Sequence, residues 1–224
     1  MHPMQSRGMP AAMDRRSFLK LSAAGLAGFA LLGPAATGVV QAQVGRGPSP
    51  GSRLMKEFET AAAEYGAPVG LLLAMGYVNT RWEMPDPAAN EYEKGNLHGW
   101  GSYGIMALVK NPTSDTLGEA SRLTGIPEET LKTDRAANIR GGAALLATSI
   151  GREKPQELRG FFGAVAGRGK AGGKNYKAVA GVGGGELYAE QVFEALQNGA
   201  SETTRSGERI SLAARSLNER IGGR

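Results

Sequence analysis

Apolar side chains recur at helical spacing along much of the chain after residue 52. Residues 53–65 carry them three or four positions apart, which predicts an amphipathic helix with Ser52 as its N-cap. Residues 69–82 are apolar on nearly every side, which is typical of a helix at the centre of a core. Gly70 and Gly76 are poor helix formers, and we expect them to let neighbouring helices approach this one closely.

The rest of the chain continues this helical pattern. Further helices are predicted over residues 116–123, 127–131, 135–150, 156–166 and 186–196. No alternating apolar and polar run of any length is found, so period-two strands are not indicated. The pattern therefore predicts a mainly α fold with little or no β-sheet.

A long segment without periodicity follows the central helix. Pro85 and Pro87 prevent the helix from continuing, and residues 84–101 form a loop of a length that is usually functional or disordered. The loop contains Tyr92, His98 and Trp100, and disordered segments are poor in aromatic residues. The chain then returns through the glycine-marked stretch 102–108. A helix end beside a returning loop predicts a cleft.

The first 42 residues are predicted to be a signal peptide rather than part of the fold. Residues 14–20 read DRRSFLK, which is a twin-arginine export pattern, and residues 40–42 (VQA) fit a small-residue cleavage site. The apolar stretch 21–32 is too short to span a membrane, which takes about 20 apolar residues. We therefore expect export by the twin-arginine route, with no stable membrane anchor after cleavage.

Composition divides the remaining chain into three parts. Residues 43–52 are rich in Gly, Pro and Ser and are predicted to be a linker, residues 53–198 the folded domain, and residues 199–224 a polar tail or interdomain connector. The chain has 26 basic and 21 acidic side chains, of which four basic and one acidic lie in the signal peptide. The remainder thus carries 22 against 20, a net charge of +2, which does not indicate nucleic-acid binding.

Cysteine and histidine counts exclude several kinds of chemistry. The chain has no cysteine, and its two histidines are His2 and His98. A zinc site of the His/Cys type and Cys-His catalysis therefore lack their residues, and a Ser-His-Asp triad could use only His98. We expect no metal and no cofactor.

The predicted cleft has the residue types of a saccharide site. Rings that could stack on sugars are provided by Trp82, Trp100 and Tyr103, and hydrogen-bonding groups by Asn79, Thr80, Asn96, His98 and Ser102. The alternative is that Trp82 and Tyr77 pack in the core and the aromatic loop is a surface hairpin.

Cleavage of a glycosidic bond needs a carboxylic acid beside the glycosidic oxygen. The candidates are Glu83, Asp86, Glu91 and Glu93. Only Glu83 is attached to the end of the predicted central helix, which would hold it rigidly. The alternative for Glu83 is a solvated carboxylate, because a helix C-terminus disfavours negative charge.

Three segments resemble motifs of a known family. They are residues 71–82 (LLLAMGYVNTRW), 103–108 (YGIMAL) and 134–146 (DRAANIRGGAALL). In this order and spacing they resemble the lysozyme-like domain of soluble lytic transglycosylases and goose-type lysozymes, and the resemblance covers about residues 53–198. It implies a lysozyme-like helical domain that binds peptidoglycan glycan strands. The implied substrate-binding residues are Asn79, Trp82, His98, Trp100, Tyr103, Met106 and Asn138.

Two positions depart from that family's pattern. The catalytic glutamate of the family falls on Asn79, and the glutamine of its second motif falls on Ala107. Asparagine has no proton to give, so the resemblance implies a site that binds a muropeptide without cleaving it. An active lytic transglycosylase or muramidase that uses Glu83 is the alternative, and a non-enzymatic domain that binds a protein partner is a third possibility.

Residues 77–83 (YVNTRWE) also resemble an N-terminal module of exported N-acetylmuramoyl-L-alanine amidases. In those proteins the lysozyme-like domain precedes a zinc amidase domain, and the tail from residue 200 would then be the start of the connector. The resemblance implies a wall-targeting module in the cell wall or in the extracellular or periplasmic space.

Overall fold

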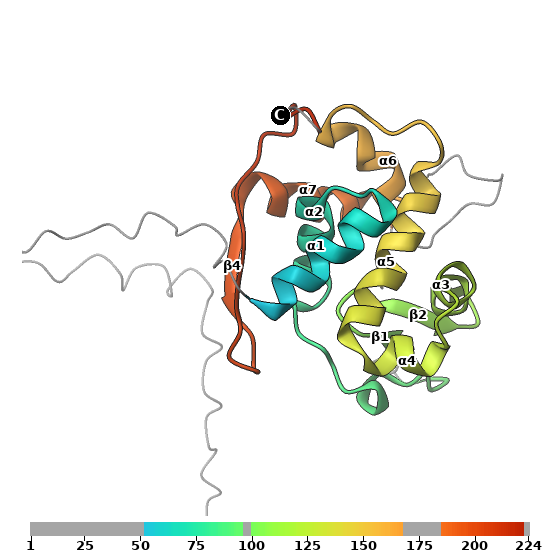
Figure 1. The fold of residues 1–224 in the computed structure, drawn as a ribbon. Coiled ribbons are helices and arrows are strands. Elements are labelled where there is room, and N and C mark those ends of the chain that lie inside the picture. The colour runs from blue at the N-terminus through green and yellow to red at the C-terminus, as the bar shows by residue number, and fades with distance from the viewer. Residues whose placement is uncertain (1–51, 96–99, 168–184, 222–224) are drawn as a thin grey trace, which may run out of the picture. The chain divides into compact units, whose positions relative to one another are not determined.

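The computed structural model describes residues 52–95, 100–167 and 185–221 (Figure 1). The predicted signal peptide, the linker up to residue 51 and the candidate residue His98 lie outside these ranges. The helices are α1 (Arg53–Tyr65), α2 (Val69–Thr80), α3 (Thr116–Thr124), α4 (Glu128–Thr133), α5 (Arg135–Ile150), α6 (Phe162–Val165) and α7 (Glu186–Asn198), with 3-10 turns η2 (Pro87–Asn90) and η3 (Leu158–Phe161). The strands are β1 (Ser102–Tyr103), β2 (Leu108–Asn111), β3 (Ser114–Asp115), β4 (Ala200–Thr203) and β5 (Arg209–Leu212).

The first two helices form as the apolar spacing predicts. The Ser52 hydroxyl accepts a hydrogen bond from the Met55 amide and caps α1, which ends at Gly66 in the left-handed region. In α2 all seven residues from Gly70 to Gly76 are buried. A Cβ added at Gly76 would lie 2.9 Å from the ring of Phe58 on α1, so close approach of the two helices requires glycine there.

Helix α5 is the second buried helix. It packs against α1 on one side and against α3 and α4 on the other (Figure 1). Asp134 caps it by accepting a hydrogen bond from the Ala137 amide at 2.7 Å. A Cβ added at Gly142 would lie 2.7 Å from the Met106 side chain, so the small residues of α5 let the 103–108 turn lie directly against the helix.

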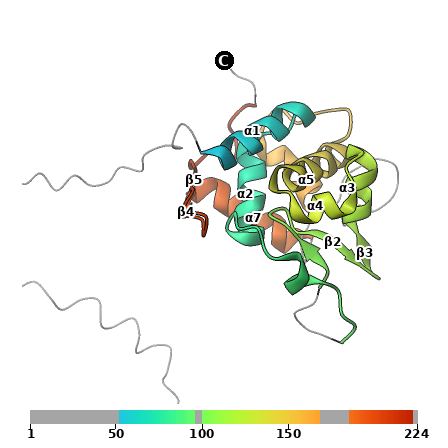
Figure 2. The same cartoon turned by 60° about the horizontal axis from the view of Figure 1, so that its bottom comes forward.

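The described residues are about 54% helical, which agrees with the predicted helix-rich fold. The expectation of little or no β-sheet is wrong. Strands β1, β2 and β3 form an antiparallel sheet beside α3 and α4 (Figure 2), and β4 pairs with β5. These strands are two to four residues long, which is too short for a period of two to stand out in the sequence.

The stretch predicted to be a tail is largely packed. Ile210 and Leu212 on β5 are buried in the same core as α2, because residues two apart on a strand face the same side. Beyond β5, the Arg159 amide donates to the Leu217 carbonyl at 2.9 Å, and the Ile221 amide donates to the Gln156 carbonyl at 2.8 Å. The boundary at residue 198 therefore falls inside the packed body of the protein.

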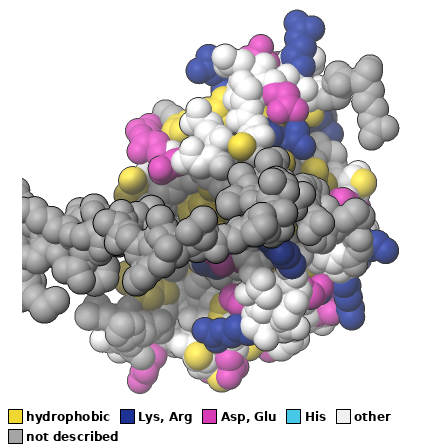
Figure 3. All heavy atoms as spheres, turned by 90° about the vertical axis from the view of Figure 1, so that its left-hand side faces the viewer, with side chains coloured by type: hydrophobic (Ala, Val, Ile, Leu, Met, Phe, Trp, Pro, Cys, Tyr) yellow, Lys and Arg dark blue, Asp and Glu magenta, His cyan; other side chains and the backbone are white. Residues whose placement is uncertain are grey.

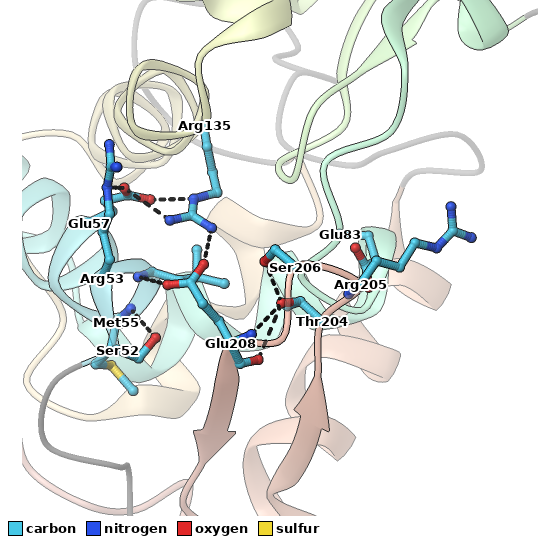
Figure 4. A network of polar contacts seen from close by, with 11 residues as sticks. Ser52, Arg53, Met55, Glu57, Glu83, Arg135, Thr204, Arg205, Ser206 and Glu208 are labelled. Carbon is cyan, nitrogen blue, oxygen red and sulfur yellow. Dashed lines mark hydrogen bonds and ion pairs between the residues drawn. The ribbon is translucent and has the colours of Figure 1, made fainter.

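A charged network joins the two ends of this body (Figure 4). The Arg135 guanidinium binds Glu57 of α1, with Nε to Oε2 at 2.6 Å, and it also pairs with Glu208 of the β4–β5 turn. The other Glu208 oxygen accepts the Leu54 amide at 3.0 Å. Partial burial raises the pKa of Glu208, but the hydrogen bonds from Arg135 and Leu54 outweigh it and lower the pKa overall.

None of the helices in the described ranges combines the length and the hydrophobicity that a membrane span requires.

Candidate functional site

The C-terminal end of α2 carries a polar pair. Asn79 lies one residue before the end of the helix and is half-buried, and Tyr188 on the first turn of α7 is 6% exposed. The two helices run antiparallel, since Gly70 at the start of α2 lies near Leu196 toward the end of α7. This packing places Asn79 beside Tyr188.

Both side chains have an unused hydrogen-bonding atom. Asn79 Nδ2 and the Tyr188 hydroxyl are buried, and neither has a hydrogen-bond partner of good geometry. Burial raises the pKa of Tyr188 well above its usual value, and the neighbouring Asn79 opposes this rise only in part. The phenol is therefore neutral at physiological pH and can both donate and accept a hydrogen bond.

Such atoms are uncommon in a folded protein, because a buried polar group without a partner costs about 1–3 kcal/mol. A ligand with hydroxyl or amide groups could supply the missing partners only by displacing the side chains that now cover these atoms. The amide and the phenol together form a neutral polar pair at the end of α2.

The turn opposite the helix end is fixed by Asn138 of α5. Its Oδ1 accepts the Met106 amide at 2.8 Å, and its Nδ2 donates to the carbonyls of Tyr103 at 3.0 Å and Leu131 at 2.9 Å. Asn138 is fully buried and its donors are both used, so it positions the turn instead of facing a ligand. The Thr80 hydroxyl, 3.3 Å from the Ile105 carbonyl, joins the same turn to α2.

Three of the predicted substrate-binding residues are core residues. Trp82, Tyr103 and Met106 are 1%, 5% and 3% exposed. Their burial contradicts the expectation that Trp82 and Tyr103 offer ring faces to a sugar, and it agrees with the alternative of core packing.

The burial of Trp82 has a backbone cause. Arg81 and Trp82 both have positive φ, 56° and 61°, so the chain reverses sharply after α2. The indole then lies back along the helix, where its N–H donates to the Leu73 carbonyl at 2.8 Å and its ring lies 4.9 Å from that of Tyr77. Arg81 lies over the outer face of the Tyr77 ring at 4.1 Å.

Two aromatic side chains of the loop are exposed. Trp100 is 48% exposed and Tyr92 is 41% exposed. Tyr92 lies close to the backbone next to Trp100, because a Cβ added at Gly101 would be 3.0 Å from the Tyr92 Cβ. The Gly101 amide donates to the Asn90 carbonyl at 2.9 Å, which holds these parts of the loop together. The sequence places Tyr92 in the loop but does not distinguish it as a site residue.

The side chain of the candidate acid Glu83 is bound to the β4–β5 turn. The prediction that the central helix carries it is wrong, because α2 ends at Thr80 and the chain turns at the next two residues. The Glu83 carboxylate accepts the Arg205 amide of the β4–β5 turn at 2.8 Å (Figure 4). Glu83 thus anchors the hairpin.

The charges around these elements are mixed. On the face drawn in Figure 3, Lys and Arg side chains are interspersed with Asp and Glu over the part of the surface that is not grey. The described residues include no group of three or more His, Cys, Asp or Glu side chains that could hold a metal ion. Comparison of the chain with protein-family models, with curated proteins and with solved structures finds no match.

Proposed function

We propose that this protein binds peptidoglycan glycan strands at the end of α2 and does not cleave them. The observation that carries the proposal is the neutral pair of Asn79 and Tyr188, whose amide nitrogen and phenol oxygen are buried beside each other without a hydrogen bond of good geometry. Glycan strands are rich in hydroxyl and acetamido groups, which can donate to the phenol oxygen and accept from the asparagine amide. Exposed Trp100 offers a ring surface for a sugar.

The absence of cleavage follows from the acid position. In the resembling lytic transglycosylases a glutamate stands where this chain has Asn79, and asparagine cannot protonate a leaving oxygen. Glu83 is bonded to the hairpin by its contact with the Arg205 amide, so it is not free to take over that role. The twin-arginine pattern at residues 14–20 supports export to the cell wall, where such a module would direct or retain the protein.

The test is incubation of the full-length protein with purified sacculi. We expect the protein to sediment with the sacculi and to release no soluble muropeptides. Release of anhydro-muropeptides would overturn the proposal in favour of an active lytic transglycosylase. Failure to sediment would overturn it in favour of a domain that binds a protein partner.

Two substitutions locate the binding site. Tyr188→Phe removes only the hydroxyl, and Asn79→Ala removes the amide, so each should weaken binding about two- to tenfold, the effect of one neutral hydrogen bond. Tyr65→Phe on α1 is the matched control and should bind like the unmodified protein. Equal binding by all four proteins would show that sacculi are bound elsewhere.

A gain-of-function variant tests the origin of the inactivity. Asn79→Glu places a carboxylic acid at the family's acid position, beside the Tyr188 hydroxyl. We expect it to release a small amount of muropeptide from sacculi. No release would show that more than the acid separates this site from an active one.

A further inference from the structure

A separate hollow of about 370 Å³ lies between η3, α6, α7 and the segment after β5. It shares no residue with the Asn79–Tyr188 site. Its volume is at the lower end of the range found for small-molecule pockets. Its lining includes Arg159, Phe162, Glu190, Phe193, Glu194 and Leu217.

The floor of the hollow is apolar and fixed in place. The rings of Phe162 and Phe193 lie 5.3 Å apart with an interplanar angle of 58°, and Phe193 is only 4% exposed. Leu217 closes the lining, and the hydrogen bond from the Arg159 amide to its carbonyl at 2.9 Å holds it there. A ligand would therefore meet a preformed surface that suits an aliphatic chain.

The rim of the hollow is charged. Glu190 and Glu194 lie four residues apart on α7, so their carboxylates share one face of the helix and repel each other. Among the described lining residues, Arg159 on η3 supplies the one positive charge. Within the described parts of the chain, none of these three side chains forms a hydrogen bond or ion pair.

The charges around the hollow determine which charged groups a ligand needs in order to pair with them. Two carboxylates and one guanidinium beside an apolar floor match a ligand with two ammonium groups, one carboxylate and an aliphatic stem. A ligand with one ammonium group leaves one carboxylate uncompensated, and a ligand without a carboxylate leaves Arg159 uncompensated. An apolar ligand would desolvate all three charges without pairing them.

We propose that the hollow binds a basic diamino acid of the lysine type. The stem lies over Phe162 and Phe193, the ammonium groups meet Glu190 and Glu194, and the carboxylate meets Arg159. The affinity is low, with a dissociation constant on the order of 1 mM, because ion pairs that face solvent contribute little and the ligand is small. This site is independent of the proposed glycan binding.

The experiment is calorimetric titration of the full-length protein with lysine and two analogues. Norleucine keeps the stem but lacks the side-chain ammonium group, and cadaverine keeps both ammonium groups but lacks the carboxylate. We expect saturable binding of lysine and about two- to fivefold weaker binding of each analogue, the loss of one solvent-exposed ion pair. Absence of saturable lysine binding, or equal binding of lysine and norleucine, would overturn the proposal.

The ligand preferences of substituted proteins show which charged side chain binds which group of the ligand. The double substitution Glu190→Gln and Glu194→Gln should abolish the preference for lysine over norleucine, and Arg159→Gln should abolish the preference for lysine over cadaverine. Glu59→Gln, an exposed carboxylate on α1, is the control and should leave both preferences unchanged. A lysine preference that survives in both variants places the binding elsewhere and overturns the assignment. Altered stability alone would weaken all ligands together and would not change these ratios.

Discussion

Replacement of Asn138 by alanine should strongly destabilise the protein. This side chain is fully buried and bridges three backbone groups that lie far apart in the sequence: the Met106 amide and the carbonyls of Tyr103 and Leu131. Alanine keeps the helix propensity of α5 but removes all three hydrogen bonds. The three backbone groups stay buried with fewer partners than before.

The size of the destabilisation can be worked out from those three backbone groups. A buried polar group left without a partner costs about 1–3 kcal/mol, and neighbouring atoms or water relieve part of the loss. The expected decrease in the free energy of unfolding is therefore about 3–6 kcal/mol. A typical domain has about 5–15 kcal/mol in total, so the variant should lie close to the limit of stability. For a domain of this size the melting temperature should fall by roughly 10–20 °C.

Urea unfolding followed by tryptophan fluorescence measures this decrease, since the buried Trp82 indole becomes exposed on unfolding. Asn198→Ala, at an exposed position at the end of α7, is the control and should change the stability by less than about 0.5 kcal/mol. Asn138→Asp is a second probe, because it keeps the acceptor for Met106 and loses both donors. A loss below about 1 kcal/mol in Asn138→Ala would refute the claim that this residue holds the turn.

Two further substitutions test other parts of the fold. Gly104 has a φ of 68°, and an added Cβ would lie 2.2 Å from Asn138 Nδ2, so Gly104→Ala should lower the free energy of unfolding by about 3 kcal/mol. Gly163 has open space around it, so Gly163→Ala should leave the stability unchanged. Thermal unfolding of the two variants distinguishes these outcomes. Glu208→Gln should lower the stability by about 1–2 kcal/mol at pH 7. Because the pKa of Glu208 is lower in the folded state, its contribution is complete above the unfolded pKa of about 4.3 and is lost as the pH falls through the folded value. The stabilities of both proteins, measured by urea unfolding at several pH values, should therefore converge as the pH falls through the folded pKa of Glu208, and a difference that stays constant with pH would contradict the assigned ion pair.

The helices could be predicted from the sequence because periodicity and caps act locally. Ser52 and Asp134 cap their helices as expected, and the apolar run that forms α2 is buried on nearly every side. The helix predicted over residues 69–82 ends two residues earlier, at Thr80. Apolar Trp82 lies four residues after Val78, at helical spacing, and the left-handed conformations of Arg81 and Trp82 leave no signal in an apolar pattern.

The candidate site could be predicted only in part. The position of Asn79 at the end of the buried helix is apparent in the sequence, whereas its partner Tyr188 is more than a hundred residues away and looks like an ordinary apolar position of an amphipathic helix. The role of Glu83 was also missed, because it depends on a hairpin that was expected to be a tail. Ile210 and Leu212, two residues apart, were the available signal for that hairpin.

The contacts of Glu208 also bear on when the protein can fold. Glu208 binds the backbone of Leu54, which precedes it by 154 residues, and Arg135, which precedes it by 73. During synthesis the start of α1 lacks this partner, and α2 lacks its contact with β5, until the chain through residue 212 has left the ribosome. Early segments can form helices but cannot close the core, so we expect the native body to appear only once the chain through β5 is available, in one late and cooperative step.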